Sequence, residues 1–138
     1  MKSIRVLIVD DLPQVRQGLA SVLNLAARRS RPKIEVAGEA QNGLEAIRQA
    51  RALQPDVILM DLEMPVLDGY EATRQIKAEQ PAVRVIILSI HAGGEVQQRA
   101  REVGADGFVV KGASFLDLLN AILGKDGPTN VFEKGEQA

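Results

Sequence analysis

The chain alternates between two kinds of apolar pattern, and this alternation constrains its fold more than any other feature of the sequence. Five short runs are rich in Val, Ile and Leu, and each is followed by a stretch whose apolar residues recur at helical spacing. Three of the runs are nearly continuous in Val, Ile and Leu, which is typical of parallel strands covered by helices on both faces. We expect parallel strands at residues 4–9, 34–37, 57–60, 83–88 and 108–110.

Helix start and stop signals between these runs agree with this pattern. Pro13 suits the first turn of a helix, and Asn42 and Ser114 are good N-caps. Pro55 and Gly104 stand just beyond expected helix ends. Since βα crossovers are right-handed, few compact arrangements suit a (βα)5 chain. We predict an α/β, doubly wound, five-stranded parallel sheet in the flavodoxin-like order 2-1-3-4-5.

Length and composition limit the chain to one domain and exclude several kinds of site. Its 138 residues contain no cysteine, which excludes disulfides, thiolate metal sites and cysteine nucleophiles. The net charge of -1 favours neither nucleic acid nor an anionic membrane as a partner of the whole domain. The apolar run before Asp10 is too short for a signal peptide or a membrane span. We expect a cytoplasmic domain over 1–124, followed by a polar tail or the start of a linker over 125–138.

Polar side chains follow the ends of four predicted strands. Asp10 and Asp11 follow the first strand, and Asp61 follows the third. Ser89 follows the fourth strand and Lys111 the fifth. In open α/β sheets ligands bind at the carboxyl ends of the strands where the strand order reverses, which here is between strands 1 and 3. The three carboxylates are therefore expected to meet at the binding crevice.

This set of side chains suits metal-assisted phosphoryl transfer. Carboxylates gathered at one place repel one another, and a cation relieves the repulsion. Hard oxygen ligands without His or thiolate favour Mg²⁺, or Mn²⁺, over zinc. Asp10 and Asp11 can hold the metal while Asp61 acts as the nucleophile, and Ser89 and Lys111 can bind phosphoryl oxygens.

Four motifs at strand ends carry a family resemblance. They are residues 9–11, 61–69, 88–89 and 108–111, in this order along the chain. Over residues 3–123 the chain resembles the receiver domain of response regulators in two-component signalling. The resemblance implies that Asp61 accepts phosphate from a sensor histidine kinase or a phosphotransfer protein. It also implies that Mg²⁺ is bound by a set comprising Asp10, Asp11, Asp61 and the backbone carbonyl of Glu63.

The resemblance implies further roles for residues near the phosphorylation site. Ser89 and Phe108 would form the conformational switch, and Glu63 and His91 would influence how fast the aspartyl phosphate hydrolyses. Phosphorylation could also promote a homodimer. Such a domain modifies only itself and releases no product from an external substrate, so we do not expect an enzyme.

The sequence departs from many receivers after Lys111, where proline is replaced by Gly112. This ending looks like that of receivers that precede a helix-turn-helix output domain. We therefore expect control of a C-terminal DNA-binding domain outside this chain, and the alternative is a stand-alone receiver that acts by protein binding.

A basic run between the first helix and the second strand is interpreted as a solvated loop without direct nucleic-acid binding. It contains Arg28, Arg29, Arg31 and Lys33.

Two other functions on similar sheets fit less well. A phosphohydrolase with an aspartyl nucleophile usually has an Asp-x-Asp pattern after strand 1 and a cap, whereas Asp10 and Asp11 are adjacent. An FMN-binding module needs a hydroxyl-rich phosphate loop and aromatic residues, but the chain has no Trp and one Tyr. Turnover of external phosphoesters would favour the first alternative, and a colourless purified protein would disfavour the second.

Overall fold

A computed structural model describes residues 3–124 and shows alternating strands and helices. The strands are β1 (Ile4–Val9), β2 (Ile34–Ala40), β3 (Val57–Asp61), β4 (Arg84–Ser89) and β5 (Gly107–Val110). The helices are α1 (Pro13–Ala27), α2 (Gly43–Leu53), α3 (Gly69–Glu79), α4 (Gly94–Glu102) and α5 (Phe115–Leu123). The predicted tail at 125–138 lies outside the described residues.

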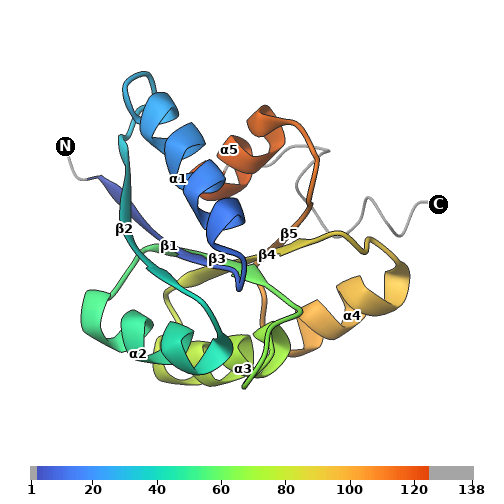
Figure 1. The fold of residues 1–138 in the computed structure, drawn as a ribbon. Coiled ribbons are helices and arrows are strands. Elements are labelled where there is room, and N and C mark those ends of the chain that lie inside the picture. The colour runs from blue at the N-terminus through green and yellow to red at the C-terminus, as the bar shows by residue number, and fades with distance from the viewer. Residues whose placement is uncertain (1–2, 125–138) are drawn as a thin grey trace.

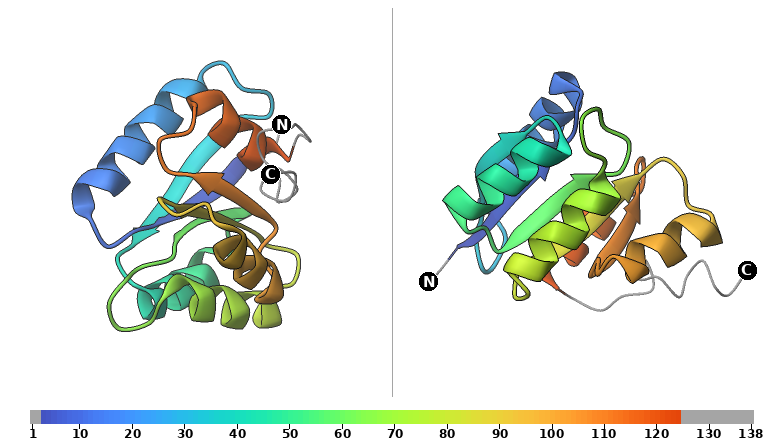
Figure 2. Two further views of the ribbon diagram at one scale, coloured as in Figure 1. Left: turned by 90° about the vertical axis from the view of Figure 1, so that its right-hand side faces the viewer. Right: turned by 90° about the horizontal axis from the view of Figure 1, so that it is seen from below.

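The sheet has the predicted topology. Its strand order is β2-β1-β3-β4-β5, and every neighbouring pair is parallel. Helices α1 and α5 cover one face, and α2, α3 and α4 cover the other (Figure 1). The left view of Figure 2 shows these two helix layers on opposite sides of the sheet. The carboxyl ends of the strands therefore open at one edge between the layers.

Alternating residues of the central strands supply two apolar cores. Ile58 and Met60 belong to the core under α2, α3 and α4, whereas Val57 and Leu59 belong to the core under α1 and α5. All of β3 is buried, since helices cover both of its faces. This double burial explains why the central strands are continuous in Val, Ile and Leu.

The predicted helix starts are confirmed. Pro13 is the first residue of α1. The Asn42 side chain accepts a hydrogen bond from the Glu45 amide, and the Ser114 hydroxyl accepts one from the Asp117 amide. These bonds satisfy backbone donors that would otherwise lack partners in the first turns of α2 and α5.

The end of the second strand differs from the prediction. Instead of ending at Ala37, β2 continues to Ala40, with a register shift opposite the step from Val6 to Leu7. The run of strand-forming residues ends before Gly38, and glycine is a poor strand former. In the structure a Cβ at Gly38 would lie 2.6 Å from Leu53 Cδ1, so glycine admits close packing of α2.

Other boundaries move by a residue or so. β3 includes Asp61, β4 begins at Arg84 and includes Ser89, and β5 begins at Gly107. Among the described residues, no helix combines the length and apolar character needed to cross a bilayer.

Candidate functional site

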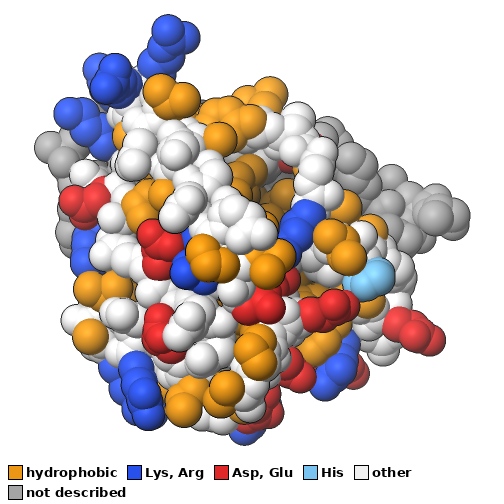
Figure 3. All heavy atoms as spheres, in the orientation of Figure 1, with side chains coloured by type: hydrophobic (Ala, Val, Ile, Leu, Met, Phe, Trp, Pro, Cys, Tyr) orange, Lys and Arg blue, Asp and Glu red, His pale blue; other side chains and the backbone are white. Residues whose placement is uncertain are grey.

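Three carboxylates meet at the carboxyl edge of the sheet, as the sequence predicts. Asp10 follows β1, Asp61 ends the neighbouring strand β3, and one oxygen from each of Asp10, Asp11 and Asp61 lies within 4.8 Å of the others. Asp10 and Asp61 are buried, and Asp11 is half-buried. Figure 3 shows acidic side chains close together near the middle of this face. The donor set consists of hard oxygens and fits a divalent metal ion.

Lys111 joins the two buried carboxylates. Its Nζ donates to Asp10 Oδ2 at 2.9 Å and to Asp61 Oδ1 at 3.1 Å. Burial lowers the pKa of Lys111, but the hydrogen bonds and charges of Asp10 and Asp61 outweigh burial and raise it. Lys111 is therefore a fixed cation at neutral pH.

Asp61 has a raised pKa. Burial is the main cause, and the charges of Asp10 and Asp11 act in the same direction, whereas the hydrogen bond and charge of Lys111 oppose them. The pKa of Asp61 is thus raised by its burial, because the hydrogen bond and charge of Lys111 outweigh the charges of Asp10 and Asp11. A divalent cation at this place would favour the ionised form of Asp61.

The acidic pair after β1 does not serve as the N-cap of α1. The N-cap residue is Leu12, which makes no side-chain capping bond. The Leu12 amide instead donates to Asp10 Oδ1 at 3.0 Å, and the Asp10 amide donates to the Ala40 carbonyl at 3.1 Å. These bonds fix Asp10 with its carboxylate directed toward Asp61 and Lys111.

Ser89 lies beside the cluster without joining it through its side chain. Its buried hydroxyl accepts a hydrogen bond from the His91 amide at 3.0 Å, and its carbonyl accepts one from the Lys111 amide at 2.8 Å. In the described part of the chain, no hydrogen bond links the Ser89 hydroxyl to Asp61 or to the Lys111 ammonium group. Ser89 lines an adjacent pocket of about 410 Å³ with Tyr70 and Arg99.

The remaining predicted residues surround this pocket or lie beneath it. Glu63 Oε1 and His91 Nε2 are 3.2 Å apart, and both side chains are exposed. Phe108 on β5 pairs in register with Ile87 of β4 and is buried in the core under α2, α3 and α4. The structure therefore places Glu63 and His91 at the mouth of the site and Phe108 inside the protein.

The turn after β3 explains why the motif at 61–69 ends in Asp-Gly. A Cβ at Gly69 would lie 2.0 Å from the Asp61 carbonyl oxygen, so only glycine allows this approach. Asp68 caps α3 by accepting from the Glu71 amide at 2.9 Å, and the Gly69 amide donates to the Leu62 carbonyl at 3.0 Å. The turn thereby holds the backbone of Asp61.

Arg16 contacts the site and Glu39 contacts Arg16, and neither residue was predicted. Arg16 of α1 donates from Nη1 to the Asp10 carbonyl at 2.7 Å and from Nε to Glu39 Oε1 of β2 at 2.9 Å. The sequence signal was available, because Arg16 is the only charged residue of α1.

The family profile described as the response regulator receiver domain matches residues 6–123. The chain belongs to this family. It is a receiver domain of the kind found in two-component response regulators, and such domains act in phosphorelay signalling.

Regulators of similar sequence agree with this assignment. The transcriptional regulatory protein LnrK of Bacillus subtilis is 38% identical over 120 residues, which are 87% of this chain and 52% of LnrK. The response regulator protein VraR of Staphylococcus aureus is 40% identical over 131 residues, which are 95% of this chain and 60% of VraR. The chain thus spans about half the length of the curated relatives it matches.

A solved structure of the same family has the same fold. It is a two-component response regulator of the LuxR family from Aurantimonas sp. SI85-9A1, with a TM-score of 0.82 and 33% sequence identity. The match covers 99% of this chain and 94% of that one. The receiver fold therefore spans the described elements from β1 to α5.

Proposed function

We propose that Asp61 accepts a phosphoryl group from a phosphohistidine and that the domain, over residues 1–124, then changes conformation. The observation that carries this proposal is the position of Asp61, which lies within 4.8 Å of two other carboxylates and 3.1 Å from the Lys111 ammonium group. The donor would be a sensor histidine kinase or a phosphotransfer protein, in keeping with the family.

In the transfer step, a carboxylate oxygen of Asp61 forms a bond to phosphorus while the P–N bond of the phosphohistidine breaks. The electron pair of that bond leaves with the imidazole nitrogen, which takes up a proton from solvent. The product is an aspartyl phosphate, which water later hydrolyses. Since the transition state is loose, positioning and charge neutralisation carry most of the catalysis.

Mg²⁺, or Mn²⁺ in its place, would be held by Asp10, Asp11, Asp61 and the backbone carbonyl of Glu63. When bound, the ion neutralises charge on the transferring phosphoryl oxygens. Lys111 holds a positive charge beside Asp61 and would bind a second phosphoryl oxygen after transfer. The set of oxygen donors supports this assignment.

Ser89 and Phe108 would carry the conformational switch. The Ser89 hydroxyl accepts from the His91 amide, so its own hydrogen can be donated to a phosphoryl oxygen. Movement of Ser89 toward the phosphate would shift the segment that leads into α4 and let Phe108 repack. Glu63 and His91, paired at the mouth of the site, would set how readily water reaches the aspartyl phosphate.

The output of the switch would be binding and not the turnover of an external substrate, so the domain would not act as an enzyme. The match to about half of LnrK, a transcriptional regulatory protein, supports control of a DNA-binding domain beyond this chain. The alternative is a stand-alone receiver that binds another protein. The domain would act in the cytoplasm, without a membrane partner or nucleic-acid contacts of its own, and phosphorylation could promote a homodimer.

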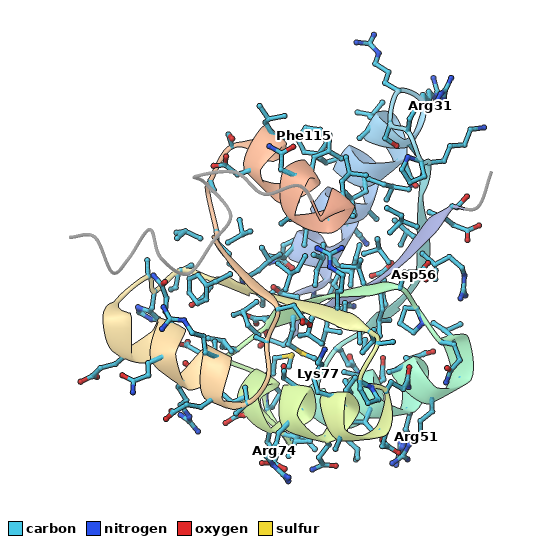
Figure 4. The ribbon with its side chains drawn as sticks, turned by 180° about the vertical axis from the view of Figure 1, so that it is seen from behind. Arg31, Arg51, Asp56, Arg74, Lys77 and Phe115 are labelled. Carbon is cyan, nitrogen blue, oxygen red and sulfur yellow. The ribbon has the colours of Figure 1, made fainter. Side chains whose placement is uncertain are left out.

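Exposure of the basic loop fits its interpretation as solvated surface. Arg28, Arg29, Arg31 and Lys33 are all exposed. Figure 4 shows Arg31 on the α1–β2 loop projecting away from the body of the protein.

The assignment of Asp61 is tested by incubating the protein with acetyl phosphate and Mg²⁺ and measuring its intact mass. Wild type and the control Asp117→Asn, which leaves the cluster intact, should gain one phosphoryl group. Asp61→Asn should gain none, and unchanged uptake would overturn the site. Lys111→Ala should keep its affinity for Mg²⁺ but lose the conformational response to phosphate. Loss of metal binding in that variant would contradict the division of roles.

A further inference from the structure

Arg16 makes two bonds that connect the acidic site to the edge strand of the sheet. Its Nη1 donates to the Asp10 carbonyl at 2.7 Å, and its Nε donates to Glu39 Oε1 at 2.9 Å. The Arg16 side chain is only 15% exposed. Arg16 is also the one charged residue of α1. Withdrawing a guanidinium group from water is unfavourable unless it is paired. The burial of Arg16 therefore depends on its bonds to the Asp10 carbonyl and to Glu39.

The carbonyl that Arg16 holds belongs to the peptide between Asp10 and Asp11. Other atoms of Asp10 are already fixed, because Lys111 and the Leu12 amide bind its carboxylate and its amide donates to Ala40. Among residues 3–124, by contrast, no hydrogen bond or ion pair is formed by the Asp11 carboxylate. The Arg16 bond holds the peptide on one side of Asp11, and the bond from the Leu12 amide to Asp10 holds the peptide on the other side.

From this juxtaposition we propose that Arg16, held by Glu39, is a positioning residue that orients Asp11 for metal binding. The inference rests on the proposed function of the acidic cluster. Arg16 acts through the peptide bond and does not bind the metal itself. Its planar fork allows one nitrogen to hold the carbonyl while another holds Glu39, which a lysine cannot reproduce in the same geometry.

The proposal predicts an effect opposite in sign to simple electrostatics. Removing a positive charge beside three carboxylates should by itself strengthen binding of a cation. Removing a group that positions a metal ligand should weaken it, typically by about 10-fold or more. The direction of the change in Mg²⁺ affinity for Arg16→Ala therefore separates the two roles.

The experiment is titration of the unphosphorylated protein with Mg²⁺ by isothermal calorimetry, with circular dichroism to check folding. Arg16→Ala should raise the Mg²⁺ Kd about 10-fold, and Arg16→Lys should lie between it and wild type. Glu39→Gln should raise the Kd by a smaller factor. The matched control is Arg51→Ala, since Arg51 is an exposed arginine paired with Glu79 at 2.8 Å. Its Kd should not change.

Each outcome decides the matter. A folded Arg16→Ala that binds Mg²⁺ as tightly as wild type, or more tightly, would overturn the positioning role and leave the proposed function intact. If wild type binds no Mg²⁺, the metal site and this inference both fail. Should Arg16→Ala not fold, Arg16→Lys and Glu39→Gln give the answer, and an unchanged Kd in both would refute the proposal.

Discussion

Replacing Asp11 by asparagine should stabilise the metal-free protein. Asp11 lies within 4.8 Å of two carboxylates, and a pair of unit charges at that distance repels by about 0.9 kcal/mol in water and about 3.5 kcal/mol at an effective dielectric constant of 20. Asp11 is half-buried, so its repulsions are closer to the aqueous value, and Lys111 offsets a part of them. We expect Asp11→Asn to raise the free energy of unfolding by about 1–2 kcal/mol.

In the presence of Mg²⁺, wild type should become more stable than Asp11→Asn. At a free Mg²⁺ concentration of 100 times Kd, binding adds about 2.7 kcal/mol to the stability of wild type. Asp11→Asn lacks one proposed ligand and should gain much less. Thermal unfolding with EDTA and then with Mg²⁺ measures both effects, at about 4 °C per kcal/mol for a domain of this size.

The control for this experiment is Glu102→Gln, which changes an exposed carboxylate in the last turn of α4. It should remain within about 0.5 kcal/mol of wild type in EDTA and respond fully to Mg²⁺. The reasoning is refuted if Asp11→Asn is the less stable protein in EDTA, or if Mg²⁺ stabilises it as much as wild type.

Three other perturbations test the site and the core. Because folding raises the pKa of Asp61 above its ordinary value of 3.8, its stabilising contribution is complete below that value and is lost as pH rises through the raised pKa. Urea unfolding in EDTA should show this fall for wild type and a flatter profile for Asp61→Asn; parallel profiles would contradict it. Gly69→Ala should prevent phosphate uptake from acetyl phosphate, since the added methyl meets the Asp61 carbonyl at 2.0 Å, and normal uptake would disprove that contact. Leu59→Ala, in a fully buried position, should lower the free energy of unfolding by about 2–5 kcal/mol in urea, and a loss below 1 kcal/mol would be inconsistent with its burial.

The sequence was sufficient for the sheet and for the acidic cluster, because both depend on local patterns. β3 is buried on both faces, so its apolar residues are continuous and its end is marked by Asp61. Asp10 and Lys111 likewise follow apolar runs directly. Once the strand order is known, the ends of β1, β3 and β5 fall at one edge, and the side chains there meet.

Contacts that depend on tertiary packing were not predictable in the same way. The sequence shows that Arg16 is the only charged residue of α1, but it does not reveal the partner of Arg16, because Glu39 belongs to β2 and meets Arg16 only in the folded chain. Strand β2 continues through Gly38 because α2 packs against that glycine. The strand propensity of the segment does not predict this contact. The orientation of the Ser89 hydroxyl depends on the conformation of the loop at His91. The sequence of that loop has no apolar periodicity from which its conformation could be predicted.

The lysine that closes the acidic cluster is 101 positions from Asp10 and 50 from Asp61 along the chain. A polypeptide still emerging from the ribosome holds all three acids long before β5 has been made. Until that last strand pairs with β4, the acids lack their ammonium partner and the cluster remains incomplete. The complete cluster of three acids and one lysine therefore forms only after β5, the last strand of the receiver domain, has been made and has paired with β4.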